Sequence, residues 1–251
     1  MALARVTASR YIMTDQSVIV MIMSRSRTTT TTPSERLASA RRSASGVRQR
    51  SAGRRKERSA ARRDAILAAA LEEFSARGFE ATRLDDVARR AGIAKGTIYL
   101  YFRDKESLFQ ELIRTMLTPI VGTIEALGAA DLPVNLLADH LVELFVREVY
   151  ETRRKDVIRL MIAEGRRFPK LAEFYYREVL SRVIAAMRAL LKRAAARGEV
   201  PAGLADFPQI IAAPGLVAIV WSGLFEKFEP LDVRAMMKTH VELLLAPRRA
   251  A

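Results

Sequence analysis

The chain has 251 residues and a formal net charge of +14 at pH 7. It contains no cysteine, which excludes disulfides, thiolate metal sites and cysteine nucleophiles. The charge is uneven, because residues 1–60 hold thirteen Arg and Lys against three Asp and Glu, whereas residues 61–251 hold twenty-nine against twenty-five. Half of the residues are hydrophobic, which is enough for a sizeable core.

The N-terminal segment is basic and poor in large apolar residues. Residues 24–64 are mostly Arg, Ser, Thr and Ala, a composition that buries too little surface to offset the entropy of ordering. We therefore expect a disordered basic arm over residues 1–60, with helix allowed only near its end. Such an arm is interpreted either as a contact to nucleic acid or an anionic surface, or as a solubilising tail.

The apolar run SVIVMIM at 17–23 is far shorter than the ~20 residues of a spanning helix, so no membrane partner is expected. Two interpretations of this run stay open. It is either a sticky, strand-like segment or translated sequence upstream of the true start, with Met21 and Met23 as later start sites. Whether residues 1–23 belong to the native protein is therefore open.

A first ordered helix is expected to begin near Arg63. In DAILAAALEEFSARGF, apolar side chains recur at helical spacing from Ile66 to Phe74. Gly78 follows as a left-handed cap, with Phe79 folded back on Phe74, the contact that accompanies such a cap.

A second helix is expected over 84–91, with Thr82 and Asp85 as a capping box and Gly92 at its end. A third is expected from about Lys95 to Phe102. On this third helix Ile98 faces inward, whereas its neighbours project outward or sideways.

Beyond these helices the chain reads as almost all helix. Gly, Pro and Asp separate long amphipathic runs at 105–127, 133–151, 154–165, 169–197, 207–227 and 232–246. Pro119 and Pro214 lie inside apolar runs and are expected to kink their helices. The pattern predicts an all-α protein, with a three-helix helix-turn-helix unit at 61–106 and a larger helical bundle at 107–251.

A glycine-bearing turn between two helices, with exposed residues on the second, is the geometry that places a recognition helix in the major groove of DNA. Leu100 is unusual there, since an outward leucine lacks a polar partner, and a thymine methyl is one apolar partner that the groove supplies. On periodicity alone, a packed helical protein without DNA binding fits equally well.

Between Ala65 and Leu112 further residues stand in a recognisable order. They are Gly78-Phe79, Thr82, Val87-Ala88, Ala91-Gly92-Ile93, Lys95-Gly96-Thr97, Tyr99, Phe102, Lys105-Glu106 and Leu108. In these residues the chain resembles the DNA-binding domain of the TetR/AcrR family of transcriptional repressors. The remaining residues resemble the family only in forming a helical bundle of the right length.

The resemblance implies a sequence-specific regulator, a repressor released from a pseudo-palindromic operator in double-stranded DNA by a small effector. It implies DNA contacts from Thr82, Arg83, Lys95, Gly96, Thr97, Tyr99, Leu100, Tyr101 and Lys105. Two residues depart from the family pattern. Ala94 stands where a serine often caps the recognition helix, and Arg83 stands where Thr or Ser usually caps the second helix.

The bundle is expected to hold an effector cavity beneath the helix that Pro119 kinks, favouring an apolar or aromatic ligand. The residues expected to line it are Met116, Ile120, Phe145, Arg159, Met161, Phe174, Tyr175 and Met187. Arg159 either pairs with a ligand carboxylate or forms a surface salt bridge. His140 and His240 have no ligand-spaced partner, so we expect no metal, no cofactor and no enzymatic activity. His140 is expected to be a satisfied, partly buried histidine, and His240 a solvated or interfacial one.

The run 207–227 is apolar around most of its circumference and must be buried. With 232–246 it predicts a homodimer through a self-complementary four-helix bundle. A cytoplasmic location is expected. The rival hypothesis is a nonspecific binder of nucleic acid or anionic membrane, which would show steep salt dependence without sequence preference.

Overall fold

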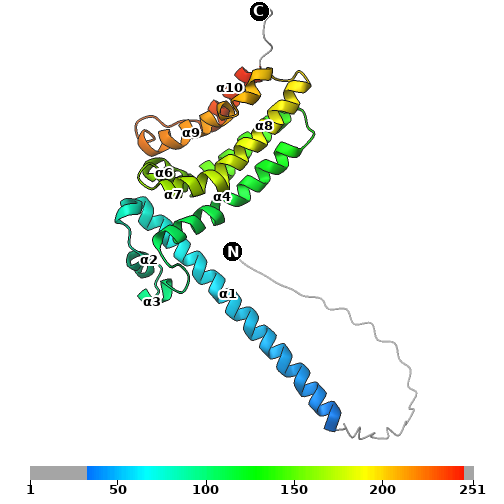
Figure 1. The fold of residues 1–251 in the computed structure, drawn as a ribbon, viewed down its shortest axis with the longest axis vertical. Coiled ribbons are helices and arrows are strands. Elements are labelled where there is room, and N and C mark those ends of the chain that lie inside the picture. Colours follow the sequence, from blue (N-terminus) through cyan, green and yellow to red (C-terminus); the bar gives the residue numbers. More distant parts are fainter. Residues whose placement is uncertain (1–32, 246–251) are drawn as a thin grey trace, which may run out of the picture. The chain divides into compact units, whose positions relative to one another are not determined.

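A computed structural model describes the chain over residues 33–245, and side chains over residues 53–245 (Figure 1). The chain divides into two units, Met1–Arg54 and Arg55–Ala251, and each is described by itself. The described part of the first unit is the beginning of helix α1, Pro33–Ala81. The second unit contains the remainder of α1 and all later helices.

Helix over residues 33–60 differs from the disordered arm that the sequence predicted. Ala, Arg and Lys are favourable helix formers, and this stretch continues without a break into the packed part of α1. Because the costly nucleus is already formed there, extending the helix requires no new one. Residues 1–32, with the apolar run 17–23, lie outside the described residues.

The next two helices are short. They are α2 (Leu84–Arg90) and α3 (Lys95–Ile98), so the prediction that the third helix reaches Phe102 is wrong. The backbone N–H groups of Tyr101 and Phe102 both donate to the carbonyl of Ile98, at 3.0 and 2.9 Å. This turn brings Phe102 into the core beside Ile98, and both side chains are buried.

The larger bundle follows the predicted runs closely. Its elements are α4 (Lys105–Ala129), α5 (Val134–Leu144), η1 (Phe145–Tyr150), α6 (Arg154–Glu164), α7 (Pro169–Tyr175), η2 (Tyr176–Leu180), α8 (Ser181–Ala196), η3 (Ala202–Asp206), α9 (Gln209–Leu224) and α10 (Val233–Leu245). Over residues 33–245 there is no strand, which confirms the all-α prediction. Helices α4 and α9 run through Pro119 and Pro214 as single elements.

Aromatic side chains join the helix-turn-helix unit to the bundle. Phe79 stacks on Phe74 with ring centroids 5.4 Å apart, which confirms the predicted fold-back, and meets Phe109 of α4 at 5.5 Å. Phe168, just before α7, packs on the same Phe79 ring at 4.7 Å. One continuous core therefore extends from α1 into α4, α6 and α7.

Helix α4 combines length with an apolar composition. It is the one described helix that is long and apolar enough to cross a membrane, by length and hydropathy. Its apolar face packs in the core, where Leu108, Leu112 and Ile113 are buried. It begins with a capping box, in which Asp104 accepts from the backbone N–H of Ser107 at 2.7 Å.

Candidate DNA-binding surface and ligand cavity

The turn between α2 and α3 requires a glycine. Gly92 has φ of 66°, in the left-handed region, and the N–H of Ile93 donates to the carbonyl of Ala88 at 3.0 Å. A side chain at Gly92 would strain this conformation. The turn fixes how α3 leaves α2, as the helix-turn-helix motif demands.

The outer edge of α3 and of the following turn carries exposed side chains, as the sequence predicted. Leu100 is 83% exposed and Tyr99 is 49% exposed, whereas the side chain of Ile98, the last residue of α3, points into the core and is fully buried. Gly96 also lies on the surface, with open space where a side chain would stand. A leucine so exposed contributes nothing to packing within this chain.

The start of α3 is held by charge instead of a cap. Ala94 occupies the N-cap without a side-chain hydrogen bond, so the cap that the family pattern supplies is missing. The ammonium of Lys95 contacts the carboxylate of Asp85 at 2.7 Å. The hydrogen bond to Asp85, and then its charge, raise the pKa of Lys95.

Three more of the predicted DNA contacts belong to the helix-turn-helix unit. Arg83 is exposed and is the N-cap of α2, without a side-chain cap bond. Thr97 is half-buried, and its backbone N–H donates to the carbonyl of Ala94 at 2.8 Å. Tyr101 is half-buried, with its hydroxyl 3.4 Å from that of Ser59 on α1.

The structure corrects the role expected of Thr82. Its side chain is buried at 1% exposure, and the hydroxyl donates to the carbonyls of Glu73 and Gly78, at 3.2 and 2.7 Å. The capping box with Asp85 is therefore wrong, because the hydroxyl turns back onto the end of α1. It stabilises that helix end and is not available to a phosphate.

Lys105 also differs from the expected phosphate clamp. Its ammonium donates to the carbonyls of Phe79 and Glu80, at 2.9 and 2.7 Å, and lies 4.8 Å from the centre of the Phe79 ring. A cation satisfies the unpaired carbonyls at a helix C-terminus, which explains its position.

Sequence reasoning missed Arg103, a highly exposed arginine in the turn after Leu100 whose guanidinium contacts Asp104.

The end of α6 contacts the end of α1 within the second unit. The Glu164 carboxylate accepts from the backbone N–H of Phe79 at 3.1 Å. Three residues further, past the end of α6, the Arg167 guanidinium pairs with Glu80. These contacts tie the helix-turn-helix unit to the bundle through α6.

The bundle contains a partly open cavity of about 250 Å³ between α4, α5, η1, η2, α8, α9 and α10, and Ile158 of α6 also lines it. Four of the eight predicted ligand residues line it: Ile120, Phe145, Tyr175 and Met187. Met116, Met161 and Phe174 do not, because they pack in or against the core shared with the helix-turn-helix unit.

Arg159 does not face the cavity. Its guanidinium donates to the Ile219 carbonyl at 3.1 Å, to the Ser222 hydroxyl at 2.6 Å and to Asp156 at 3.1 Å. The salt-bridge alternative fits these contacts, because Arg159 pairs with Asp156 of its own helix. Its hydrogen bonds to Ile219 and Ser222 fasten α6 to α9.

Sequence reasoning assigned α9 and α10 to the dimer interface alone and missed their share of the cavity. Gly215, Ile219, Met237 and His240 all line it. In α9 an almost wholly apolar sequence hides which face lines the cavity and which lies on the surface. The histidine prediction is also wrong in detail, since His140 is exposed and bonds the Leu136 carbonyl of its own helix.

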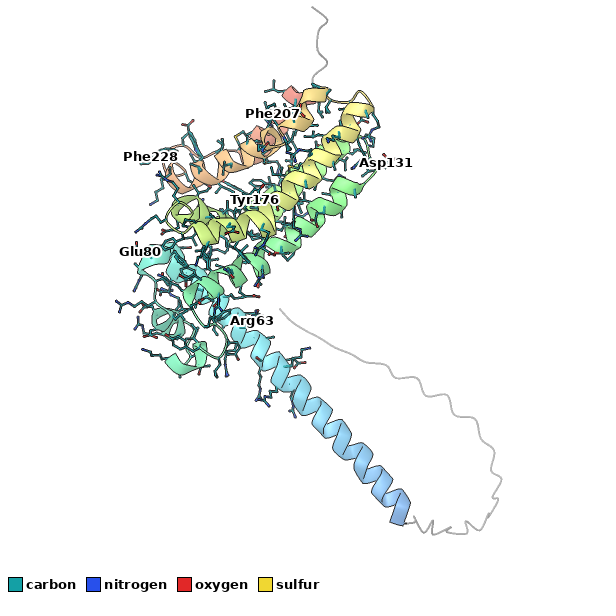
Figure 2. All side chains as sticks on the ribbon, viewed as in Figure 1. Arg63, Glu80, Asp131, Tyr176, Phe207 and Phe228 are labelled. Carbon is teal, nitrogen blue, oxygen red and sulfur yellow. The ribbon has the colours of Figure 1, made fainter. Side chains whose placement is uncertain are left out.

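The outer face of α9 is apolar and exposed. Val217, Val220 and Leu224 lie on one stripe of the helix, and Leu224 is 62% exposed. Phe207 and Phe228 stand at the two ends of the segment that bears α9, labelled in Figure 2, and both are exposed.

Over the searched part of the chain, residues 33–245, no group of His, Asp and Glu has metal-site geometry.

Both parts of the chain match family models. Residues 66–112 match the model described as "Bacterial regulatory proteins, tetR family", and residues 138–236 match "Tetracyclin repressor-like, C-terminal domain". YhgD, an uncharacterized HTH-type transcriptional regulator of Bacillus subtilis (strain 168), is 48% identical over 52 residues, 21% of this chain and 27% of YhgD. KstR2, an HTH-type transcriptional repressor of Mycolicibacterium smegmatis, is 32% identical over 116 residues, 46% of this chain and 55% of KstR2.

Solved structures share the fold. FadR from Bacillus halodurans, described as a fatty acid degradation regulator, superposes with a TM-score of 0.59 at 25% identity, over 75% of this chain and 97% of that chain. The chain spans only 27% to 55% of the length of the two curated relatives above. The two family matches fall, in order, on the helix-turn-helix unit and on the bundle that holds the cavity. The chain belongs to the TetR family of bacterial regulatory proteins.

Proposed function

We propose that the protein is a sequence-specific DNA-binding transcriptional repressor, a cytoplasmic homodimer released from its operator by a small apolar effector. The observation that carries this proposal is the edge formed by Tyr99 and Leu100, which follows a glycine-fixed turn and leaves Leu100 without a role in packing. A phenol ring and a leucine together suit the thymine methyls and phosphates of a major groove.

Charged groups around this edge suit the DNA backbone. Lys95 pairs with Asp85 in the free protein and exchanges that carboxylate for a phosphate on binding. Arg83 and Arg103 are exposed on either side of the motif and add phosphate contacts. Gly96 lets the backbone of α3 approach the groove closely, since no side chain intervenes.

A two-fold axis follows from the apolar stripe on α9. In a monomer Val217, Val220 and Leu224 would face water, whereas a second copy covers them with the same stripe. Leu243 on α10 is 73% exposed and extends the interface. Two recognition helices related by such an axis read a pseudo-palindrome, with half-sites about one helical turn apart.

The cavity supplies the effector site. Its lining is apolar, which fits the fatty acid regulation named for the Bacillus halodurans relative. An effector that prefers one arrangement of α6 shifts the population of recognition-helix spacings. The contact of Glu164 with Phe79 carries that preference to the helix-turn-helix unit. Such coupling is typically about 1–3 kcal/mol, or roughly 5–150-fold in operator affinity.

The test is selection of bound duplexes from a random library, with the full-length chain. We expect enrichment of one motif in two inverted copies, followed by saturable binding of that duplex at physiological salt. An enriched pool without a common motif, bound with a steep salt dependence, would support the nonspecific binder instead.

A further inference from the structure

The cavity lining has an unusual composition for a ligand site. Among its thirty-two residues none is Asp, Glu, Lys, Arg, Ser, Thr, Asn or Gln, and the two polar side chains are Tyr175 and His240. The guanidinium of Arg159, which reaches α9 from outside the lining, bonds α9 and Asp156 through each of its three nitrogens. The ligand of this site is therefore selected by very few polar groups.

The hydroxyl of Tyr175, at the end of α7, has no hydrogen-bond partner. Over residues 53–245 no hydrogen bond reaches it, and burial raises its pKa to about 12. The hydroxyl therefore keeps its proton and is a donor without an acceptor. The side chain is half-buried, so a ligand that supplies an acceptor at this hydroxyl gains one hydrogen bond.

His240, on α10, is already partnered. Its Nε2 lies 3.0 Å from the carbonyl oxygen of Ile210, and since a carbonyl only accepts, this nitrogen carries the proton. Tyr175 is thus the one hydroxyl side chain of the described lining, and it has no hydrogen-bond partner.

The shape of the lining adds a second constraint. From the end of α7 through η2 and α8, the lining residues run from Tyr175 through Val183 and Met187 to Leu191, a stripe roughly 24 Å long at the rise of a helix. Beyond it Leu244 and Leu245 of α10 continue the apolar wall. A molecule that fills this space is elongated and apolar over most of its length.

We infer that the cavity takes an uncharged, elongated apolar molecule, such as a fatty acyl ester, whose hydrogen-bond acceptor meets the hydroxyl of Tyr175. A free carboxylate is disfavoured in the interior because the lining holds no Lys or Arg to offset its desolvation. This inference rests on the proposed effector role of the cavity, and it adds the chemical class of the ligand.

The test compares three probes of matched chain length: methyl laurate, laurate and dodecane. Binding to the full-length chain is measured at pH 7 by displacement of a neutral apolar dye. Methyl laurate is expected to bind at least tenfold more tightly than laurate, whose charge stays unpaired. Tyr175→Phe is expected to weaken methyl laurate roughly fivefold, the effect of one hydrogen bond, and to leave dodecane unchanged.

Tyr176→Phe is the matched control, because this neighbouring tyrosine is exposed and does not line the cavity. It should leave all three affinities unchanged. Equal binding of laurate and methyl laurate, an unaffected Tyr175→Phe variant, or no binding of any probe would each overturn the inference. Operator selection by the same protein is measured separately, so loss of DNA binding would count against the proposed function and not against the ligand class.

Discussion

The carboxylate of Glu164, at the end of α6, accepts a hydrogen bond from the backbone N–H of Phe79 at 3.1 Å. The neighbouring Gly78 makes this contact possible. Gly78 adopts φ of 77° and ψ of 168°, and a Cβ there would lie 2.7 Å from the Glu164 Oε1. Only glycine combines this backbone conformation with so close a carboxylate.

Gly78→Ala is expected to lower the free energy of unfolding by about 1–3 kcal/mol from backbone strain, with a further loss from the clash. The control is Gly122→Ala, in the interior of α4, where a Cβ meets no atom within 4 Å. That change should raise stability by about 0.5–1 kcal/mol, since alanine favours helix. Urea unfolding measures whether each variant lowers or raises the free energy of unfolding. A lower free energy of unfolding for Gly122→Ala would contradict the argument.

A double-mutant cycle separates the two parts of the Gly78 effect. Glu164→Ala removes the carboxylate that the new Cβ would meet, so Gly78→Ala should cost less in that background than in the wild type. Additive effects would mean that the clash with Glu164 contributes nothing and that the backbone conformation alone requires glycine.

The second prediction concerns the exposed edge after α3. Tyr99→Ala and Leu100→Ala are each expected to weaken operator binding roughly tenfold, because each removes a contact in the groove. Both side chains are exposed, so the melting temperature should hardly change. Tyr176→Ala removes another exposed tyrosine, on η2, and serves as the control in fluorescence anisotropy. Wild-type affinity in both variants would mean that another surface contacts the bases of the operator.

The third prediction separates two roles for Lys105. If the ammonium chiefly satisfies the carbonyls of Phe79 and Glu80, Lys105→Met lowers the free energy of unfolding by about 1–3 kcal/mol. At roughly 2–4 °C per kcal/mol, the melting temperature falls by roughly 2–12 °C. Lys192→Met, on an exposed position of α8, should leave it unchanged. If Lys105→Met is as stable as the wild type but no longer binds the operator, the result would support a phosphate contact by Lys105 instead.

The order of the helices and most boundaries in the bundle were predictable from the sequence because they depend on local patterns. The helix over 33–60 and the early end of α3 at Ile98 were not predicted. Helical spacing of apolar residues, and Gly or Pro at the breaks, are visible along the chain. The outward position of Leu100 was likewise predictable, since it follows from the inward position of Ile98 two residues earlier.

The remaining site residues depend on partners far along the chain. Thr82 and Lys105 read as free polar groups in the sequence, yet each bonds carbonyls at the end of α1 that only the fold brings within reach. Arg159 bonds a carbonyl sixty residues away, at Ile219. Local patterns contain no information on such acceptors, so the sequence placed these three side chains at ligand or DNA.

The fourth prediction concerns the dimer. Val217→Glu and Leu224→Glu place a charge on the exposed stripe of α9 and should give monomers that no longer bind the operator. Leu136→Glu, on an exposed position of α5, is the control and should stay dimeric. Ile219 is unsuitable for this test because it is 2% exposed and lines the cavity. Light scattering that finds a dimer for both α9 variants would place the interface on another surface.

The last prediction concerns the basic N-terminal unit. Residues 1–54 contain ten arginines against two acidic residues. If these arginines bind DNA phosphates, deleting the unit reduces the slope of log K against log salt by roughly 0.9 for each phosphate that is no longer neutralised. The preferred operator should stay the same, because phosphate contacts carry no sequence information.

The control keeps the chain length and changes the charge alone. Glutamine replaces five arginines of α1 in the full-length protein, at Arg36, Arg41, Arg42, Arg48 and Arg50. Binding of the selected duplex is then followed from low to high salt. A slope reduced in both variants supports the phosphate contact, because charge is what they have in common. An unchanged slope in both would leave the unit as a solubilising tail, and a changed operator preference would mean that it reads bases.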